Sequence, residues 1–301
     1  MSENILIISG ATACGKSNLA LEFGNYEDIA IINADSLQIY EGLPILSSQP
    51  TKEERKKIPH HLYSHLKPHE SSSVGSWLGL VKNIVTQIWA EKKLPVIVGG
   101  SGMYVSKLVD GISKMPEVSE ENSKAAQELY DKIGHEEFQK KFGTKKIIDR
   151  QRLLRACEIL RQTGQPISFW QQQPQEKIFP SAKFTHINID LERRKLYENC
   201  NSRFEKMLKA GALDEVGELL KLKPQRDWQI TKTLGFEEIC LFLNDEISYE
   251  KMLEIATQKT RNYAKRQMTW FRNQLPDKQV FESSQAALEF LKSDNFKTHT
   301  T

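Results

Sequence analysis

The residues with the clearest chemical potential form one short segment near the start of the chain. Residues 10–17 fit the phosphate-binding pattern G-x-x-x-x-G-K-[ST], and they are Gly10, Ala11, Thr12, Ala13, Cys14, Gly15, Lys16 and Ser17. In a loop of this kind backbone amides hold phosphate oxygens, Lys16 supplies a positive charge, and the Ser17 hydroxyl can bind Mg²⁺. The pattern predicts that the protein binds a phosphate. It leaves open whether that phosphate is transferred, hydrolysed or released as a leaving group.

Asp35 is the next candidate, in the segment NADSLQIY of residues 33–40. Its carboxylate could bind Mg²⁺, act as a general base, or cap a helix with Ser36 beside it. Enzymes of phosphoryl transfer combine metal-binding acids with a group that orients the nucleophile. After the third apolar run, where a metal-binding acid often stands, this chain has GGS at residues 99–101. The sequence therefore weakens the interpretation as an ordinary nucleotide-hydrolysing enzyme.

A parallel α/β sheet would bring these segments together. Short apolar runs predict buried strands at residues 5–8, 30–33, 95–98 and 184–190. Helical spacing of apolar residues follows, at residues 17–23 and 77–88 and from residues 103 and 193 onward. Strands that alternate with helices are typical of a doubly wound sheet, whose ligands lie beyond the carboxyl ends of the strands. The phosphate loop, the Asp35 segment and the GGSGMY turn at residues 99–104 are therefore the strand ends of interest.

Residues 114–181 interrupt this alternation. They hold polar, helical sequence without a strong strand, and the α/β pattern resumes at residue 184. We therefore predict one catalytic core, formed by residues 1–113 and 182–301, with a helical insertion domain at residues 114–181.

Composition limits the class of protein. A chain of 301 residues with 39% hydrophobic residues can bury a core, and its net charge of +3 leaves nucleic-acid affinity to local patches. The four cysteines lie far apart without a C-x-x-C pair, which argues against a zinc site and a disulfide framework. No uncharged stretch approaches the ~20 apolar residues of a membrane span. We expect a soluble, cytoplasmic monomer without zinc and without a membrane partner.

Two basic runs favour an RNA partner. Residues 145–161 contain six Lys or Arg and two acids, and Arg152 and Arg155 share one helix face. Residues 259–276 contain five Lys or Arg, no acid, and interleaved aromatic residues. Basic groups with aromatics suit a nucleic-acid backbone and splayed bases, although each run could instead be a solvated helix face.

Eight segments, taken in order, resemble the signature segments of the bacterial tRNA dimethylallyltransferases, also called tRNA isopentenyltransferases. They are GATACGKS, INADSLQIY, PHHLY, GGSGMY, DRQRLLRACEILRQTGQPIS, SRFEKMLKAGALDEV, TLGFEEI and TRNYAKRQMTWFRNQ. The resemblance runs from Ile5 to about Gln274 and includes the insertion. It implies a P-loop NTPase-like parallel sheet flanked by helices. It also implies transfer of a dimethylallyl group from its diphosphate to the exocyclic amine of the adenosine 3′ of the anticodon, with diphosphate as the leaving group.

The resemblance further implies roles for individual residues. The exocyclic amine is a poor nucleophile, and the implied base that accepts its proton is Asp35. Thr12 would line the meeting point of the two substrates, and Arg203 would lie near the diphosphate, with Mg²⁺ on Ser17. The residues implied to contact the tRNA and its anticodon stem-loop are Asp35, Ser36, Leu37, Gln38, Ser101, Gln151, Arg152, Leu153, Leu154 and Arg155.

The chain departs from the family pattern at three places. Many members carry an arginine where this chain has Asn199, and a proline where it has Ala11. Residues 44–50 read PILSSQP where the family usually has Gly-Thr-Ala-Lys-Pro, so a lysine is missing near the substrate entrance. These departures leave open how the positive charge around the diphosphate is completed.

Three other functions remain open. A small-molecule or nucleoside kinase would explain the phosphate loop, but not the DRQRLLRA segment or the missing metal-binding acid. A non-enzymatic RNA-binding module would leave the combination of Lys16, Ser17 and Asp35 unexplained. A relative that prenylates free adenine nucleotides would have no use for the basic insertion.

Overall fold

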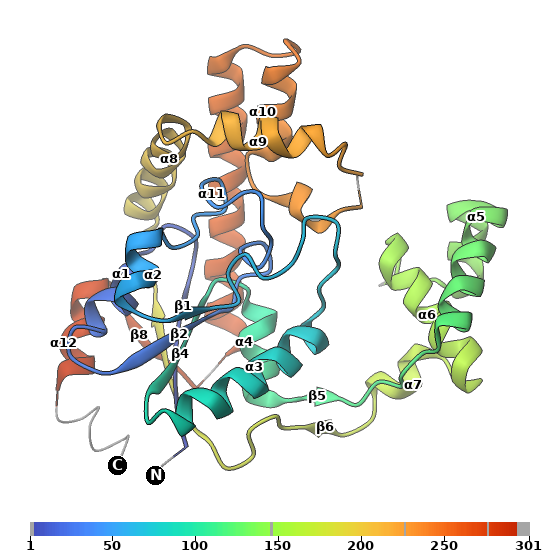
Figure 1. Ribbon diagram of the computed structural model, residues 1–301, viewed down its shortest axis with the longest axis horizontal. Coiled ribbons are helices and arrows are strands. Elements are labelled where there is room, and N and C mark those ends of the chain that lie inside the picture. The colour runs from blue at the N-terminus through green and yellow to red at the C-terminus, as the bar shows by residue number, and fades with distance from the viewer. Residues whose placement is uncertain (1–2, 145–146, 226, 276, 294–301) are drawn as a thin grey trace. The chain divides into compact units, whose positions relative to one another are not determined.

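The computed structural model describes residues 3–144, 147–225, 227–275 and 277–293, and Figure 1 shows its elements. The chain divides into two compact units. The core unit consists of Met1–Val109 and Phe179–Thr301, and the helical unit of Asp110–Ile178. The boundaries of the helical unit lie a few residues before the limits of 114 and 181 expected from the sequence.

The core unit is built on a six-stranded parallel sheet in the order β3-β2-β4-β1-β7-β8. Its strands are β1 (Asn4–Gly10), β2 (Ile29–Asn33), β3 (His60–His61), β4 (Leu94–Gly99), β7 (Lys183–Ile189) and β8 (Gln279–Phe281). The four predicted strands correspond to β1, β2, β4 and β7, which occupy the centre of the sheet, and the α/β fold class is confirmed. The edge strands β3 and β8 have two and three residues, too few for a periodic signal.

Helices cover both faces of this sheet (Figure 1). Those of the core unit are α1 (Lys16–Phe23), α2 (Lys52–Lys57), α3 (Val74–Ala90), α4 (Gly102–Asp110), α8 (Arg193–Lys209), α9 (Ala212–Lys221), α10 (Phe236–Leu243), α11 (Tyr249–Gln274) and α12 (Ser284–Lys292), with a 3₁₀ turn at Gln229–Lys232. One face of β1 presents Leu6 and Ile8 to a cluster of buried side chains from α1, α8, α11 and α12. The alternate residues of β1 point to the opposite face. On that opposite face, Trp77 of α3 is fully buried and donates its indole N–H to the Asn33 carbonyl at 2.8 Å, which fixes the end of β2.

Polar residues cap the starts of several helices. Ser73, Asp149, Ser248 and Ser283 each accept a backbone N–H three residues further on, at the starts of α3, α6 (Arg150–Thr163), α11 and α12. Helix α1 has no such side-chain cap, and Gly15 before it has φ 98°. The first backbone N–H groups of α1 therefore have no side-chain acceptor at this cap, which suits a loop that binds phosphate.

The helical unit has a small core of its own. Its elements are β5 (Ile112–Ser113), α5 (Glu120–Phe142), α6 (Arg150–Thr163), α7 (Ile167–Gln171) and β6 (Gln175–Glu176). Ala126 and Phe138 of α5 pack against Leu153 and Cys157 of α6. The sequence predicted no strong strand in this region; the two-residue strands β5 and β6 pair antiparallel and are too short to leave a pattern.

Candidate active site

A cavity of about 1080 Å³ lies beyond the carboxyl ends of the central strands. Its lining includes the phosphate loop after β1, Asp35 after β2 and Gly100 after β4. Arg203 of α8 and Gln267 of α11 line it from two further elements. Because all the strands are parallel, these segments meet at one edge of the sheet, as the sequence analysis expected.

The phosphate loop closes tightly on itself. Gly10 has φ 144°, and a side chain there would lie 2.5 Å from the Ile189 carbonyl oxygen, so only glycine fits. Cys14 is buried beneath the loop with 3% of its surface exposed, which makes it a packing residue. The Lys16 ammonium donates to the Ala11 carbonyl at 2.7 Å, so it lies across the loop that it belongs to.

Arg203 connects α8 to the loop. Its Nη1 donates to Thr12 Oγ1 at 2.7 Å, and its Nε donates to Ser48 Oγ at 2.9 Å. Burial lowers the pKa of the Arg203 guanidinium, while Cys200 and the Asp35 carboxylate oppose that shift. A buried guanidinium therefore contacts the phosphate loop at Thr12 and also interacts electrostatically with Asp35, and such a group can bind negative charge strongly.

The positions where the chain departs from the family pattern carry polar contacts. Asn199, one helical turn before Arg203, donates its Nδ2 to the Ala13 carbonyl at 3.1 Å. In the segment of residues 44–50, Gln49 Oε1 accepts from Arg55 Nη2 at 3.1 Å. Arg55 and Lys206 both line the cavity. Positive charge therefore reaches the cavity from α2 and α8 as well as from Lys16.

Asp35 is held by its neighbours in a defined orientation. Asn33, which is fully buried, accepts from the Asp35 backbone N–H at 2.8 Å and donates to the carbonyls of Asp35 and Leu62, both at 2.9 Å. The Asp35 Oδ1 accepts the backbone N–H of Leu37 at 2.9 Å. The Asp35 carboxylate therefore caps a turn, which is the structural role considered for it. Within the described residues Oδ2 accepts no hydrogen bond, so it remains available to a ligand of the cavity.

Two tyrosines that line the cavity surround this carboxylate. Burial raises the pKa of Tyr63 and of Tyr263, and the charge of Asp35 raises both further. Both phenols are therefore neutral hydrogen-bond donors at neutral pH. Asp35 therefore lies in a partly buried environment with two neutral phenols and the Arg203 guanidinium, where its carboxylate can act as a proton acceptor.

The other residues expected near the adenine lie around the same turn. Ser101 Oγ accepts the backbone N–H of Ser36 at 3.1 Å and donates to Ser36 Oγ at 3.4 Å. Gln38 donates its amide Nε2 to the carbonyls of Ser47 at 2.8 Å and Ser48 at 2.9 Å. Leu37 and Gln38 line the cavity. The Gln38 amide thus binds the protein itself, and only its oxygen remains for a substrate.

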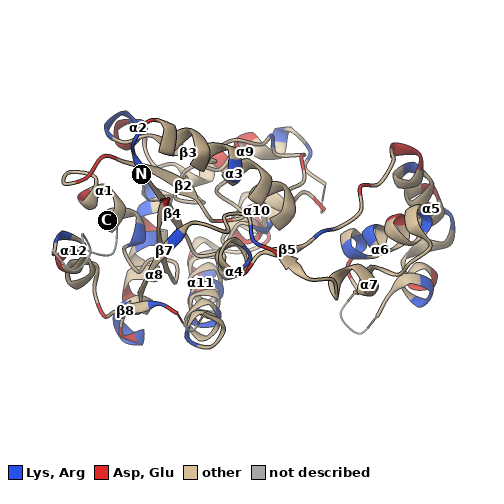
Figure 2. Ribbon diagram, turned by 90° about the horizontal axis from the view of Figure 1, so that it is seen from below, with Lys and Arg blue, Asp and Glu red and all other residues tan. Residues whose placement is uncertain are grey.

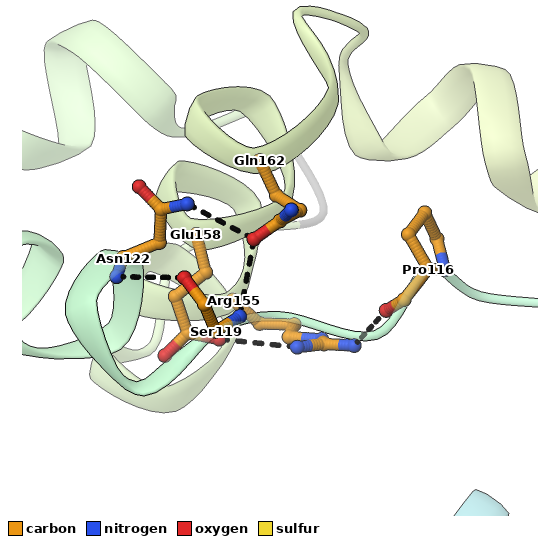
Figure 3. Close-up of polar contacts among 6 residues, drawn as sticks. All are labelled: Pro116, Ser119, Asn122, Arg155, Glu158 and Gln162. Atoms are coloured by element: carbon orange, nitrogen blue, oxygen red, sulfur yellow. Dashed lines mark hydrogen bonds and ion pairs between the residues drawn. The ribbon is translucent and has the colours of Figure 1, made fainter.

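Residues 151–155 of the helical unit separate into exposed and buried side chains. Leu153 is fully buried, with its side chain packed against α5, and the contact of residues 151–155 with RNA stays a prediction. Arg155 donates to Glu158 at 3.2 Å and to the Pro116 carbonyl at 3.0 Å (Figure 3). Arg152 is exposed and lies 3.3 Å from Asp149, while Gln151 is exposed and Leu154 partly buried. Lys145 and Lys146, which belong to this basic run, lie outside the described residues.

The second basic run lies on α11 (Figure 2), and three of its five basic side chains have polar partners elsewhere in the core unit. Lys259 pairs with Glu237 at 2.6 Å and also with Glu238, Arg261 donates to Asn201 at 2.6 Å, and Arg272 donates to Asp190 at 2.8 Å. Lys265, Arg266 and Trp270 line a shallow surface pocket of about 500 Å³. Lys259, Arg261 and Arg272 therefore stabilise the core unit. Lys265, Arg266 and Trp270 form a basic and aromatic surface.

Gln267 of α11 is the functional candidate that sequence reasoning missed. It is 6% exposed, and its side chain contacts both the phosphate loop and the turn after β4. The sequence marked Gln267 only by its place within the TRNYAKRQMTWFRNQ segment. That segment was interpreted from its basic and aromatic residues, as a run that suits RNA.

Two further observations concern metal clusters and membrane-spanning helices. In the described part of the chain, no group of three or more His, Cys, Asp or Glu residues could hold a metal ion. None of the helices in the described ranges is long and apolar enough to cross a membrane.

Comparisons with known proteins give one consistent result. The model of the IPP transferase family matches residues 38–274, and that of the isopentenyl transferase family matches residues 3–65. The tRNA dimethylallyltransferase of Wolbachia pipientis subsp. Culex pipiens (strain wPip) is 38% identical over 299 residues, which is 96% of this chain and 99% of that protein. The crystal structure of the tRNA isopentenylpyrophosphate transferase of Bacillus halodurans is 26% identical, with a TM-score of 0.70 over 99% of this chain and 97% of that one. The corresponding enzyme of Staphylococcus epidermidis is 27% identical, also with a TM-score of 0.70, over 99% of this chain and 100% of that one.

Proposed function

The chain belongs to the IPP transferase family, and on this premise we propose that it is a tRNA dimethylallyltransferase. The reaction joins the exocyclic nitrogen of the adenosine 3′ of the anticodon to C1 of dimethylallyl diphosphate. The carbon–oxygen bond to the diphosphate breaks, and the diphosphate leaves with the electron pair. The observation that carries this proposal is one cavity lined both by a phosphate loop and by a fixed carboxylate, Asp35. The other acid of the described lining, Glu54, accepts the Thr51 backbone N–H at 2.7 Å and caps the start of α2.

Asp35 is the proposed general base. Asp35 lines the cavity, its Oδ1 is fixed by the Leu37 amide, and its Oδ2 makes no hydrogen bond to a described residue. The nucleophilic nitrogen must lose a proton as the new carbon–nitrogen bond forms, because otherwise the product carries a positive charge. Asp35 Oδ2 accepts that proton, a role that contributes typically about 10²–10⁴-fold to a rate.

The phosphate loop is the proposed donor end. The amides at the start of α1, the Lys16 ammonium and the Arg203 guanidinium stabilise the charge that develops on the departing diphosphate. Lys16 must turn from the Ala11 carbonyl toward the ligand, which a flexible lysine side chain allows. Thr12 and Arg203 are hydrogen-bonded to each other and both line the cavity, and Thr12 lines the proposed meeting point of the two substrates.

Residues of this end also fit Mg²⁺. The Ser17 hydroxyl is exposed beside the loop and makes no hydrogen bond to a described residue. Mg²⁺ is usually held by one or two protein groups together with substrate phosphates rather than by a cage of protein ligands. Ser17 and the diphosphate oxygens supply such a set, and the bound ion would neutralise charge on the leaving group.

The acceptor end is proposed to hold the adenine. Ser36, Leu37, Gln38 and Ser101 form the turn around Asp35. Since chemistry on a base requires it to leave its stack, the adenosine must enter this turn as a flipped nucleotide. The remaining oxygen of Gln38 and the backbone of this turn are the groups available to recognise it.

The helical unit is the proposed contact to the anticodon stem-loop. Gln151 and Arg152 on α6 are exposed, and Arg155 and Leu154 lie beside them. Arg152 is the group best suited to a phosphate, since its ion pair with Asp149 is solvent-exposed and therefore weak. Arg155 orders the segment before α5 through the Pro116 carbonyl, so its contribution to RNA binding is at least partly indirect.

A single incubation separates this function from the alternatives. The protein is mixed with bulk tRNA and Mg²⁺ and given either labelled dimethylallyl diphosphate or ATP labelled in its terminal phosphate. We expect label from the prenyl donor in tRNA and none from ATP in any acceptor. Phosphate transfer from ATP to a small molecule would support a kinase, and label in free adenine nucleotides alone would support the nucleotide-prenylating relative.

A further inference from the structure

One amide side chain joins the donor end of the cavity to the acceptor end. Gln267 Oε1 accepts the backbone N–H of Thr12 at 2.8 Å, and Gln267 Nε2 donates to the Gly100 carbonyl at 2.9 Å. With 6% of its surface exposed, Gln267 is shielded from water, so these bonds are not easily exchanged for bonds to solvent. The amide uses a different atom for each end of the site.

On the donor side, Gln267 determines the direction of one peptide of the phosphate loop. Loop amides of this kind ordinarily point toward phosphate oxygens. Here the Thr12 N–H points to Gln267, while the Thr12 hydroxyl accepts from Arg203 at 2.7 Å. Thr12 is therefore held through its backbone by α11 and through its side chain by α8.

On the acceptor side, Gln267 contacts the turn that supports Asp35. A side chain at Gly100 would lie 2.4 Å from Gln267 Nε2, so the glycine permits this close approach. The next residue, Ser101, donates its backbone N–H to the Ala34 carbonyl at 3.2 Å, and its hydroxyl accepts from Ser36 at 3.1 Å. Through the Gly100–Ser101 peptide, Gln267 is thus linked by hydrogen bonds to both neighbours of Asp35, Ala34 and Ser36.

We propose that Gln267 is a positioning residue that fixes the phosphate loop relative to the Asp35 turn. The proposal rests on the function proposed above, in which the leaving group is bound by the loop and the proton acceptor stands on the turn. Transfer requires the amine, C1 and the leaving oxygen to align, and a misplacement of about 1 Å can cost about 10²-fold in rate. Fixing the two ends against each other therefore acts on the reaction step more than on the binding of either substrate.

Replacement with methionine tests this directly. Gln267→Met keeps the length of the side chain and removes both hydrogen bonds. We expect kcat to fall by about 10- to 100-fold, while KM for tRNA and the Kd of inorganic pyrophosphate change less than about threefold. The control is Gln258→Met, on an exposed part of the same helix, where the amide makes its hydrogen bonds among the described residues to Asn262 and Arg261. An unchanged kcat, or a fall in kcat matched by an equal loss of folded protein in a melting curve, would overturn the proposal.

Replacement with glutamate adds a readout that a packing defect would not move. An ionised carboxylate can accept from Thr12 but cannot donate to the Gly100 carbonyl, whereas a protonated carboxyl can do both. The kcat of Gln267→Glu relative to the unaltered protein should therefore rise as pH falls, by up to about tenfold per pH unit above the pKa of that carboxyl. A ratio that is independent of pH contradicts the hydrogen-bonding role.

Hydrogen exchange distinguishes failure of this inference from failure of the proposed function. The Thr12 amide, followed by NMR, should exchange slowly in the unaltered protein and at least about tenfold faster in Gln267→Met, because its buried acceptor is lost. This measurement needs no turnover. If the unaltered protein modifies no tRNA, the proposed function fails alone, and if Thr12 exchanges equally in both proteins, the Gln267 inference fails alone.

Discussion

His186 lies in the sheet directly beneath the phosphate loop and should make the stability of the core unit depend on pH. Its Nε2 lies 2.7 Å from Ser9 Oγ, next to the first residue of the loop. The Ser9 hydroxyl also lies within hydrogen-bond distance of two acceptors, Asn188 Oδ1 at 3.0 Å and the Ile187 carbonyl at 3.4 Å. When Ser9 donates to either of them, His186 donates its Nε2–H to Ser9. Burial lowers the pKa of His186 to about 4, and the positive charge of Lys278 adds to this effect.

The magnitude follows from the difference between the folded and unfolded pKa values. The folded pKa lies below the ordinary value of 6.5, so the unfolded chain takes up a proton first as the pH falls. The contribution to the free energy of unfolding is complete above the ordinary pKa and is lost progressively as the pH falls toward the folded pKa. Linkage then gives a loss of about 2 kcal/mol near pH 5 and about 3 kcal/mol near pH 4.

The assay compares urea unfolding of the unaltered protein and of His186→Gln near pH 8, pH 6 and pH 5. Glutamine can still donate to Ser9 and does not titrate, so carboxylates that titrate in the same range affect both proteins equally. The unaltered protein should lose about 2 kcal/mol more than the variant between pH 8 and pH 5. Equal losses would show that His186 carries its proton in the folded state or titrates normally there, and would refute the reasoning.

Three further predictions concern the site and the helical unit. Asp35→Asn should lower kcat by about 10²–10⁴-fold with tRNA affinity within a few-fold, which single-turnover kinetics beside filter binding would check; unchanged turnover would exclude the base. Lys16→Ala should weaken pyrophosphate binding in calorimetry and leave tRNA binding unchanged, because the phosphate loop binds one of the two substrates. The reverse result would show that the donor end and the acceptor end were assigned the wrong way round. Arg152→Ala should reduce the salt dependence of tRNA binding by about one unit of slope. Arg155→Ala should instead lower the melting temperature through loss of the Pro116 contact; equal salt slopes in all three proteins would remove this part of α6 from the RNA interface.

The sequence was sufficient for the centre of the fold. Strands β1, β2, β4 and β7 are continuous apolar runs because both faces of a parallel sheet are covered, and such runs can be recognised locally. The placement of the phosphate loop beside the Asp35 turn followed from the rule that parallel strands end at one edge. The edge strands β3 and β8 were not predicted, because two or three residues contain no period.

Details that depend on distant contacts could not be predicted in the same way. Gln267 meets Thr12 across most of the chain, and nothing local distinguishes it from a solvent-exposed glutamine on a basic helix. The tRNA contact expected for all five residues 151–155 rests on the family resemblance. An α-helix has 3.6 residues per turn and cannot expose five consecutive side chains. Its periodicity already separates Leu153, which is buried, from the exposed Arg152.

The central claim is that the phosphate bound by this loop is a leaving group. The most direct test is mass spectrometry of nucleosides from tRNA incubated with the protein, Mg²⁺ and dimethylallyl diphosphate, with Asp35→Asn as the control. We expect the adenosine 3′ of the anticodon to gain one dimethylallyl group in exchange for one hydrogen, and we expect this modification to be strongly reduced in the control. Unmodified adenosine after treatment with the folded, unaltered protein would contradict it, and so would full modification by the Asp35→Asn variant.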